Sequence, residues 1–199
     1  VEEGRHSAFL SGTMATSAQP QAARMDIGCI TADAYAAHRE ALIDLLTDAV
    51  THGSSVGFVL PLSRDEAGRF WDALLPSLRA GNTVVIKPSE YTTLGTLEMV
   101  RLRAGSRLLW VATDAQGLAG TVQLELVTRK NGVNRAEVQK LLVHTRARRG
   151  GVGRALMLAL EARARQLDRG LLYLDTEAGS GAEAFYRALG YACIGGLPQ

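Results

Sequence analysis

Apolar residues recur at helical spacing in two stretches of the first third of the chain. Both stretches predict amphipathic helices, the first preceded by a short strand at residues 27–30 and capped by Thr31. Its buried face comprises Ala34, Leu42, Leu45, Leu46 and Val50. The second helix begins at about Ser63, and its inner side comprises Phe70, Trp71, Leu74, Leu75 and Leu78. Pro76 falls in its last turn, where proline disfavours helix.

Strand and helix patterns alternate in the second half of the chain. Strands are predicted at residues 108–113, 118–128, 135–143 and 171–174, and helices after Gly153 and at residues 182–189. The helix after Gly153 has an apolar side that includes Leu156 and Leu160, and a polar side that includes Glu161. The strand–helix–strand order predicts a right-handed crossover between parallel strands. These patterns predict a mixed α/β fold class with α+β character.

Two segments do not share these patterns. Residues 1–25 are rich in Ala, Ser, Gly and Gln without apolar periodicity, which predicts a disordered leader. The tetrapeptide at residues 78–81, Leu-Arg-Ala-Gly, recurs at residues 102–105, so that residues 82–105 read as an insertion. We expect a single domain at residues 26–197, interrupted at about 82–105.

Composition and charge exclude several classes of protein. With 199 residues, 47% hydrophobic and 21% charged, the chain is ordinary for one globular domain. A net charge of +2 is too small for a general nucleic-acid binder, and no apolar run is long enough to span a membrane. The first 25 residues lack the apolar core of a secretory signal, so we expect a cytoplasmic protein. Cys29 and Cys193 are not in a metal-ligand spacing, and we expect no metal.

Candidate chemistry concentrates in a basic, glycine-rich turn at residues 148–153, between a predicted strand and a predicted helix. Glycines allow the backbone to approach a ligand closely, and the first N–H groups of a helix have no intrahelical partner. The helix dipole and four arginines at positions 146, 148, 149 and 154 favour an anion. These features predict a diphosphate site, although a glycine cap or a solvated basic turn would have the same residues.

Three motifs in order resemble the GCN5-related N-acetyltransferase (GNAT) family. They are R-x-x-G-x-G at residues 148–153, the strand at 134–143, and A-x-x-F-Y-x-x-x-G-[FY] at 182–191. Residues 134–143 and 170–180 are similar in particular to members that confer tabtoxin resistance, and the resemblance covers residues 26–81 and 106–197. Residues 80–90 resemble a stretch of the aldehyde dehydrogenases, which is too short to form a dinucleotide-binding domain.

The resemblance implies the GNAT acyltransferase fold, a central mixed sheet with helices on both faces, and it implies acetyl-CoA as the co-substrate. The backbone at Leu142 and Val143 would pair with the pantetheine arm, and Ser180 would replace an Asn that the family often has at Gly179. The full set of residues expected to bind the co-substrate is Leu142, Val143, Arg148, Arg149, Gly150, Gly151, Val152, Gly153, Arg154 and Ser180.

Three residues are candidates for the chemistry. An amine acceptor must lose a proton before it attacks, and Glu137 and Asp175 are the candidate bases, or they bind the acceptor's ammonium group. Alternatively, Glu137 forms a salt bridge with Arg135 or Lys140, and Asp175 caps the next loop. Tyr186 matches the signature tyrosine and would protonate the departing thiolate; otherwise it is a core aromatic residue.

We expect the chain to acetylate an amine of a small molecule, with an amino-acid-like toxin or antibiotic as the leading acceptor. The alternatives are a catalytically impaired acyl-CoA-binding chimaera with an aldehyde dehydrogenase fragment, and nucleic-acid binding through residues 146–154. The family has two further strands after the last helix, whereas only residues 191–194 would remain here. Truncated C-terminal strands would leave an unprotected edge beside Asp175, open to aggregation or to strand exchange in a homodimer.

Overall fold

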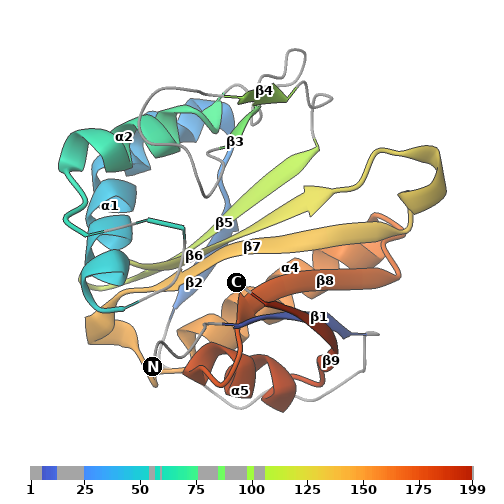
Figure 1. Ribbon diagram of the computed structural model, residues 1–199. Helices are drawn as coiled ribbons and strands as arrows, with labels where there is room; N and C mark the ends of the chain where they lie inside the picture. Colours follow the sequence, from blue (N-terminus) through green and yellow to red (C-terminus); the bar gives the residue numbers. More distant parts are fainter. Residues whose placement is uncertain are drawn as a thin grey trace.

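A mixed sheet forms the centre of the computed structural model, which describes the backbone of residues 6–12, 25–53, 57–58, 60–75, 85–87, 98–100 and 106–198. Among these residues, seven strands lie in the order β2-β5-β6-β7-β8-β1-β9 (Figure 1). β7 and β8 are parallel, and the other neighbouring strands are antiparallel. The strands are β1 (His6–Gly12), β2 (Asp26–Cys29), β5 (Arg107–Asp114), β6 (Gly117–Leu126), β7 (Arg135–Val143), β8 (Leu171–Glu177) and β9 (Ala192–Pro198).

Helices cover both faces of the sheet, which confirms the predicted fold class. α1 (Ala32–Thr51) and α2 (Arg64–Asp72) bury Leu42, Leu46 and Trp71 against Leu109 and Val111 of β5. α4 (Val152–Gln166) and α5 (Gly181–Ala188) share the opposite core with alternate residues of β5 to β8. Short 3-10 helices η1 (Lys130–Gly132) and η2 (Thr145–Ala147) precede and follow β7. No helix in the described ranges has the length and apolarity needed to cross a bilayer.

The start of α4 lies unusually close to β6. A Cβ atom at Gly120 would lie 2.8 Å from the Leu142 carbonyl oxygen, 3.0 Å from Cγ1 of Val152 and 3.1 Å from Cδ1 of Leu156. Because this space is already filled, only a residue without a side chain fits at position 120. Gly120 therefore sets how closely the first turns of α4 approach the sheet.

The prediction that Glu161 lies on a polar, solvated side of α4 is wrong. Glu161 is 8% exposed, and its Oε1 accepts a hydrogen bond from the hydroxyl of Tyr191 at 3.2 Å. Burial raises the pKa of the Glu161 carboxyl. The segment that follows α5 covers this side of α4, so that Tyr191 links the last part of the chain to the helix.

The two ends of the described chain also correct the sequence-based expectations. Residues 6–12, expected to be part of a disordered leader, form β1 between β8 and β9 (Figure 1). β1 pairs with β8 from Ser7↔Glu177 to Gly12↔Leu172, and it pairs with β9 on its other side. β9 is longer than the expected strand at residues 191–194. The edge of β8 is therefore not open, because β1 satisfies its backbone groups. Residues 1–5 and 13–24 lie outside the described residues.

Two short strands lie within the expected insertion at residues 82–105. β3 (Val85–Lys87) and β4 (Glu98–Val100) pair with each other as a separate antiparallel ribbon. The remainder of the segment lies outside the described residues. The described part of the segment adds no strand to the central sheet.

Replacing Gly120 with Ala should lower the free energy of unfolding by about 1–3 kcal/mol, because the added methyl group overlaps Val152 and Leu156. Gly28→Ala in β2 is the matched control, since a Cβ atom there meets nothing within 4 Å. Urea unfolding of both variants measures the effect. Equal stability of the two variants would mean that α4 does not pack this closely on β6.

Candidate functional site

β7 carries one extra residue that separates it from β8. The β7–β8 pairing ends at Glu137↔Tyr173, although β7 continues to Val143 and β8 to Glu177. On the other side of β7, the register with β6 shifts between Gln123↔Gln139 and Thr121↔Leu142. Lys140, inside this shift, has a φ of 48°, in the left-handed region. This β-bulge turns the second half of β7 and opens a gap between two parallel strands.

Along a strand the backbone groups of successive residues point to opposite neighbouring strands, and this alternation decides which groups of β7 face the gap. The N–H of His144 donates to the carbonyl of Ala119 in β6 at 2.9 Å. In an antiparallel ladder the residues that bond to the partner alternate, so Leu142 faces β6 and Val143 faces away from it. Val143 thus keeps its expected place at the gap. Leu142 does not, because its backbone is directed to β6 and its side chain is buried in the core.

The glycine-rich turn presents an uncapped helix end. Arg149 and Gly151 have φ angles of 62° and 82°, and no side chain caps α4 at Gly151. The N–H groups of Val152, Gly153 and Arg154 are the first of the helix, where intrahelical acceptors are lacking. The Gly150 N–H is different, because it donates to the Ala147 carbonyl at 3.3 Å. The donors of the turn therefore concentrate in the first turn of α4.

Gly153 brings this helix end to the gap. A Cβ atom at Gly153 would lie 3.3 Å from Cζ of Phe185 in α5 and 3.6 Å from Cγ2 of Val143. The first turn of α4 is thus in contact with both α5 and the last residue of β7. The uncapped N–H groups and the gap form one continuous site.

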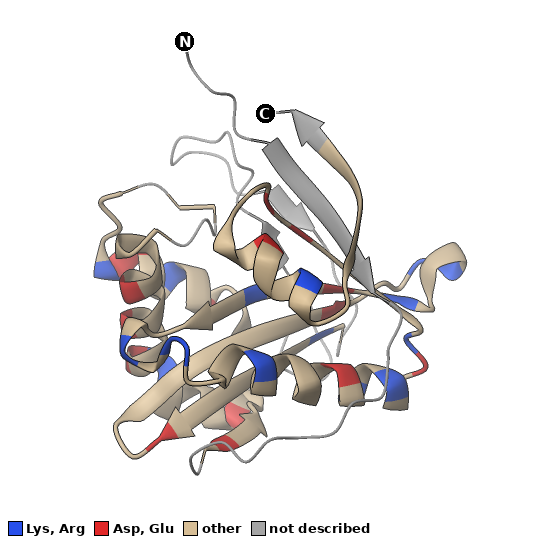
Figure 2. Cartoon of the chain, turned by 90° about the horizontal axis from the view of Figure 1, so that it is seen from below, with Lys and Arg blue, Asp and Glu red and all other residues tan. Residues whose placement is uncertain are grey.

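The four arginines of the turn do not act alike. Arg148 and Arg149 are exposed, and Arg154 is partly buried in the first turn of α4. In Figure 2 the ribbon of the turn before α4 has the blue of basic residues. Arg146 instead binds the β5–β6 turn, donating to Oδ2 of Asp114 at 2.6 Å and to the Leu118 carbonyl at 3.0 Å. Arg148, Arg149 and Arg154 therefore bring positive charge to the start of α4, with Nε of Arg148 donating to the Val143 carbonyl at 3.5 Å, and Arg146 holds the turn in place.

Asp48 of α1 fixes the start of the turn, a role that its position in the sequence did not reveal. Its two carboxylate oxygens accept bonds from the N–H and the hydroxyl of Thr145, both at 2.7 Å. His144 Nδ1 lies 3.4 Å from the same carboxylate and accepts the N–H of Arg146, as expected for a structural histidine. Burial alone would raise the pKa of Asp48, but the two Thr145 bonds outweigh it and lower the pKa.

A polar row crosses the sheet at the point where the gap opens. Arg107, Glu125, Glu137 and Tyr173 lie opposite one another on four adjacent strands. Arg107 binds Glu125, and the hydroxyl of Tyr173 donates to Oε2 of Glu137 at 3.3 Å. Burial and the Glu137 carboxylate raise the pKa of Tyr173 to about 12, so it remains a hydrogen-bond donor. Glu137 is thus partly buried and oriented by a phenol, a partner that the sequence did not predict.

Asp175 lies two residues beyond Tyr173 on β8, on the same face of the strand and beyond the last β7–β8 pair. Its side chain is exposed. The structure therefore places Glu137 at the closed end of the gap and Asp175 along its open part.

Tyr186 is at once a core aromatic residue and a neighbour of the gap. It is 8% exposed and packs edge to face with Phe185 and Tyr191 at centroid distances of 5.3 and 5.8 Å. Burial, followed by the charge of Asp175, raises its pKa well above the ordinary value. Tyr186 is therefore a weaker acid than an ordinary tyrosine.

Ser180 caps α5. Its hydroxyl donates to the Glu177 carbonyl at 2.6 Å and accepts the N–H of Glu183 at 3.2 Å. Because its one proton is already donated, Ser180 has no donor to offer a ligand. The expected contact of Ser180 with the co-substrate is not supported by this geometry.

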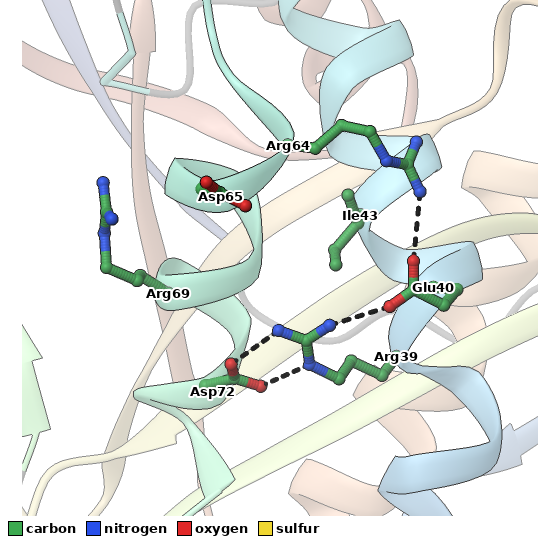
Figure 3. Close-up of a pocket in the computed structure, with 7 residues that line it drawn as sticks. All are labelled: Arg39, Glu40, Ile43, Arg64, Asp65, Arg69 and Asp72. Atoms are coloured by element: carbon green, nitrogen blue, oxygen red, sulfur yellow. Dashed lines mark hydrogen bonds and ion pairs between the residues drawn. The ribbon is translucent and has the colours of Figure 1, made fainter.

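A polar hollow of about 340 Å³ lies between α1 and α2 (Figure 3). Its charges are paired across the two helices: Arg39 binds Asp72 and Glu40, and Arg64 binds Glu40 and Asp44. No lining residue comes from β7, β8, α4 or α5. The hollow is therefore a helix–helix contact separate from the gap.

Comparison with known proteins gives a consistent result. Residues 71–191 match the model of the acetyltransferase (GNAT) family. An N-acetyltransferase from Staphylococcus aureus has a similar fold, with a TM-score of 0.59, 13% identity, and coverage of 87% of this chain and 86% of that one. A ribosomal-protein-alanine N-acetyltransferase from Brucella melitensis has a TM-score of 0.58 and 19% identity, with 85% of each chain covered. An aminoglycoside acetyltransferase from an uncultured soil sample has a TM-score of 0.54 and 17% identity, with 83% and 86% covered.

Replacing Asp48 with Asn should lower the free energy of unfolding by about 1–2 kcal/mol at neutral pH, because Thr145 loses a charged acceptor. The folded pKa of Asp48 is lowered, so this stability is present above the unfolded pKa of about 3.9 and is lost as the pH falls through the folded value. The deficit of the variant should therefore disappear in acid.

Urea unfolding between pH 3 and 8 measures this dependence. Asp44→Asn, one turn earlier on α1, is the control, because the pair of Asp44 with Arg64 is exposed and such pairs contribute little to stability. A deficit of Asp48→Asn that does not change with pH would exclude the ionised carboxylate as the source of stability.

Proposed function

The chain belongs to the GNAT family of acetyltransferases, and on this premise we propose that it moves the acetyl group of acetyl-CoA to an amine of a small molecule. The observation that carries the proposal is the uncapped start of α4 at the mouth of the β7–β8 gap. An anion-binding helix end and an opening between parallel strands suit the two ends of one long, phosphorylated ligand.

The diphosphate of acetyl-CoA would lie on the N–H groups of Val152, Gly153 and Arg154, with Arg148 and Arg149 adding positive charge. The pantetheine arm would follow the gap, where it takes the place of β8 as the partner of the Val143 backbone. The stretch of β7 that this arm would follow, from Val143 to Glu137, is about 20 Å long as an extended strand, and the bulge shortens it somewhat. A backbone N–H in the gap would stabilise negative charge on the thioester oxygen, an effect worth about 3 kcal/mol per donor.

Glu137 is the stronger candidate for the base. It is partly buried at the closed end of the gap and is oriented by Tyr173, whereas Asp175 is exposed. In the proposed reaction a carboxylate takes one proton from the acceptor's ammonium group, directly or through water. The neutral nitrogen then forms a bond to the acetyl carbon, the carbon–sulfur bond breaks, and the nitrogen loses a second proton to water, which leaves a neutral amide and the CoA thiolate. Asp175 would attract the ammonium group toward Glu137.

Tyr186 would act as a hydrogen-bond donor to the departing sulfur. Its raised pKa means that complete transfer of its proton to a thiolate is unfavourable, because the thiol is the stronger acid. A hydrogen bond stabilises the thiolate without ionising the phenol. The proton that CoA finally carries would come from water or from the protonated base.

We infer that the acceptor is an amino-acid-like toxin or antibiotic. The resemblance of residues 134–143 and 170–180 to tabtoxin-resistance members supports this class. A catalytically impaired chimaera remains the competing proposal, since β3 and β4 pair apart from the sheet. The chimaera proposal requires that the protein binds acetyl-CoA but releases no CoA, whichever amine is added.

Gly151→Asp should weaken acetyl-CoA binding about tenfold or more relative to Gly151→Asn. Both side chains tolerate the left-handed φ of 82°, and a Cβ atom there meets nothing within 4 Å, so the pair differs only in charge. Isothermal titration calorimetry measures both affinities. Equal affinities would contradict the placement of the diphosphate at this turn. Tight DNA binding without CoA binding would favour a nucleic-acid role.

Glu137→Gln should lower the rate of CoA release with an accepted amine about 100-fold at pH 7. The loss of rate should become smaller toward pH 9, where more of the amine is already neutral.

Asp175→Asn should mainly raise KM, because the exposed carboxylate would attract the acceptor's ammonium group rather than take its proton. Unchanged rates for both variants between pH 6 and 9 would exclude both carboxylates from the mechanism.

A further inference from the structure

Lys140 occupies a conformation that lysine rarely adopts. Its φ of 48° falls in the left-handed region, which favours glycine or asparagine. This conformation costs most other residues about 1 kcal/mol or more. The residue is the extra one in the β7 bulge that opens the gap. The bulge therefore places the backbone of a lysine at the point where the gap opens.

The Lys140 ammonium group lies beside two aromatic rings. Its Nζ is 5.9 Å from the centroid of Phe58 and 5.7 Å from that of Phe70, which meet edge to face at 5.2 Å. Phe58 lies in the segment between α1 and α2, and Phe70 is in α2. These rings hold a positive charge near the α1–α2 side of the bulge.

The polar row lies on this same side. Gln139, next to Lys140, donates to Oε2 of Glu125 at 3.1 Å, and Arg107 binds the same oxygen. Gln139 and Glu137 alternate along β7, so both side chains project from one face of the strand. Lys140 reaches the rings of the α1–α2 side, which also packs on this face. β7 therefore presents a carboxylate at position 137 and an ammonium group at position 140, about 10 Å apart along the strand.

We propose that Lys140 determines specificity by binding a carboxylate of the acceptor while the acceptor's amine lies at Glu137. This inference rests on the proposed function and extends it to a substrate class: amines that also carry a carboxylate. A zwitterionic acceptor complements both ends of this pattern of charges. A polycationic amine would bring positive charge against Lys140, which disfavours it.

A panel of α- and ω-amino acids, each with its own carboxamide, tests the proposal by CoA release. The two members of a pair differ in charge and hardly in shape. The wild-type protein should favour the carboxylate member. Lys140→Gln should lower kcat/KM about 10- to 100-fold for that member and leave the carboxamide within about twofold.

Two further variants control the interpretation. Lys140→Arg keeps the charge and should keep most of the preference. Lys130→Gln removes the same charge from the exposed η1 segment and should change neither member of a pair.

The possible failures are distinguishable. Equal loss for both members in Lys140→Gln would show that Lys140 only packs against the two rings, and overturn the proposal. A wild-type protein that acetylates both members equally would also overturn it while leaving the proposed function intact. A protein that binds acetyl-CoA but acetylates no amine would overturn the proposed function, and this inference with it.

Discussion

One extra residue in β7 is the constraint on which the site depends. Up to Glu137, β7 and β8 are ordinary parallel neighbours whose backbone groups satisfy each other. The bulge at Lys140 then rotates β7 relative to β8, so the backbone N–H of Val143 loses a strand partner, whereas its carbonyl accepts a bond from Nε of Arg148 at 3.5 Å. Unpaired backbone groups near a protein interior are costly, and a ligand with its own amides can satisfy them. The same bulge that leaves the sheet incomplete therefore makes it a binding site.

The remaining parts of the molecule bring other groups to this gap. Gly120 and Gly153 remove side-chain volume on two sides of the first turn of α4, so that its N–H groups lie beside the end of β7. Asp48 ties the intervening turn to α1, and Arg146 ties it to the β5–β6 turn. The turn is thus held by α1 and by the β5–β6 turn. Anion binding at a helix end benefits from such rigidity, because the donors need no rearrangement when the ligand arrives.

Much of this arrangement follows from the sequence, because helix and strand periodicities and the glycine turn are local signals. The bulge also has a signal, which is a change of phase in β7: Ala136 and Val138 pack on the α4 core, and the next residues to do so are Leu141 and Val143. Residues on one face of a regular strand are two apart, so the interval of three from Val138 to Leu141 marks the extra residue. The Tyr173–Glu137 and Asp48–Thr145 contacts have no such signal, since each joins residues distant in the chain whose types suit many solvated positions. The perturbed acidity of Tyr186 likewise comes from burial that only the assembled core provides.

The position of β1 has a consequence for how the chain is made. β1 belongs to the first residues of this chain, but its partners β8 and β9 are the last two strands. During synthesis it leaves the ribosome well before either partner exists, and proteins usually begin to fold from the end that emerges first. The pairing of Gly12 with Leu172 is therefore among the most distant contacts of the fold, and such contacts form slowly. A nascent chain of this protein must keep β1 unpaired, and within reach of chaperones, until β8 and β9 have been synthesised.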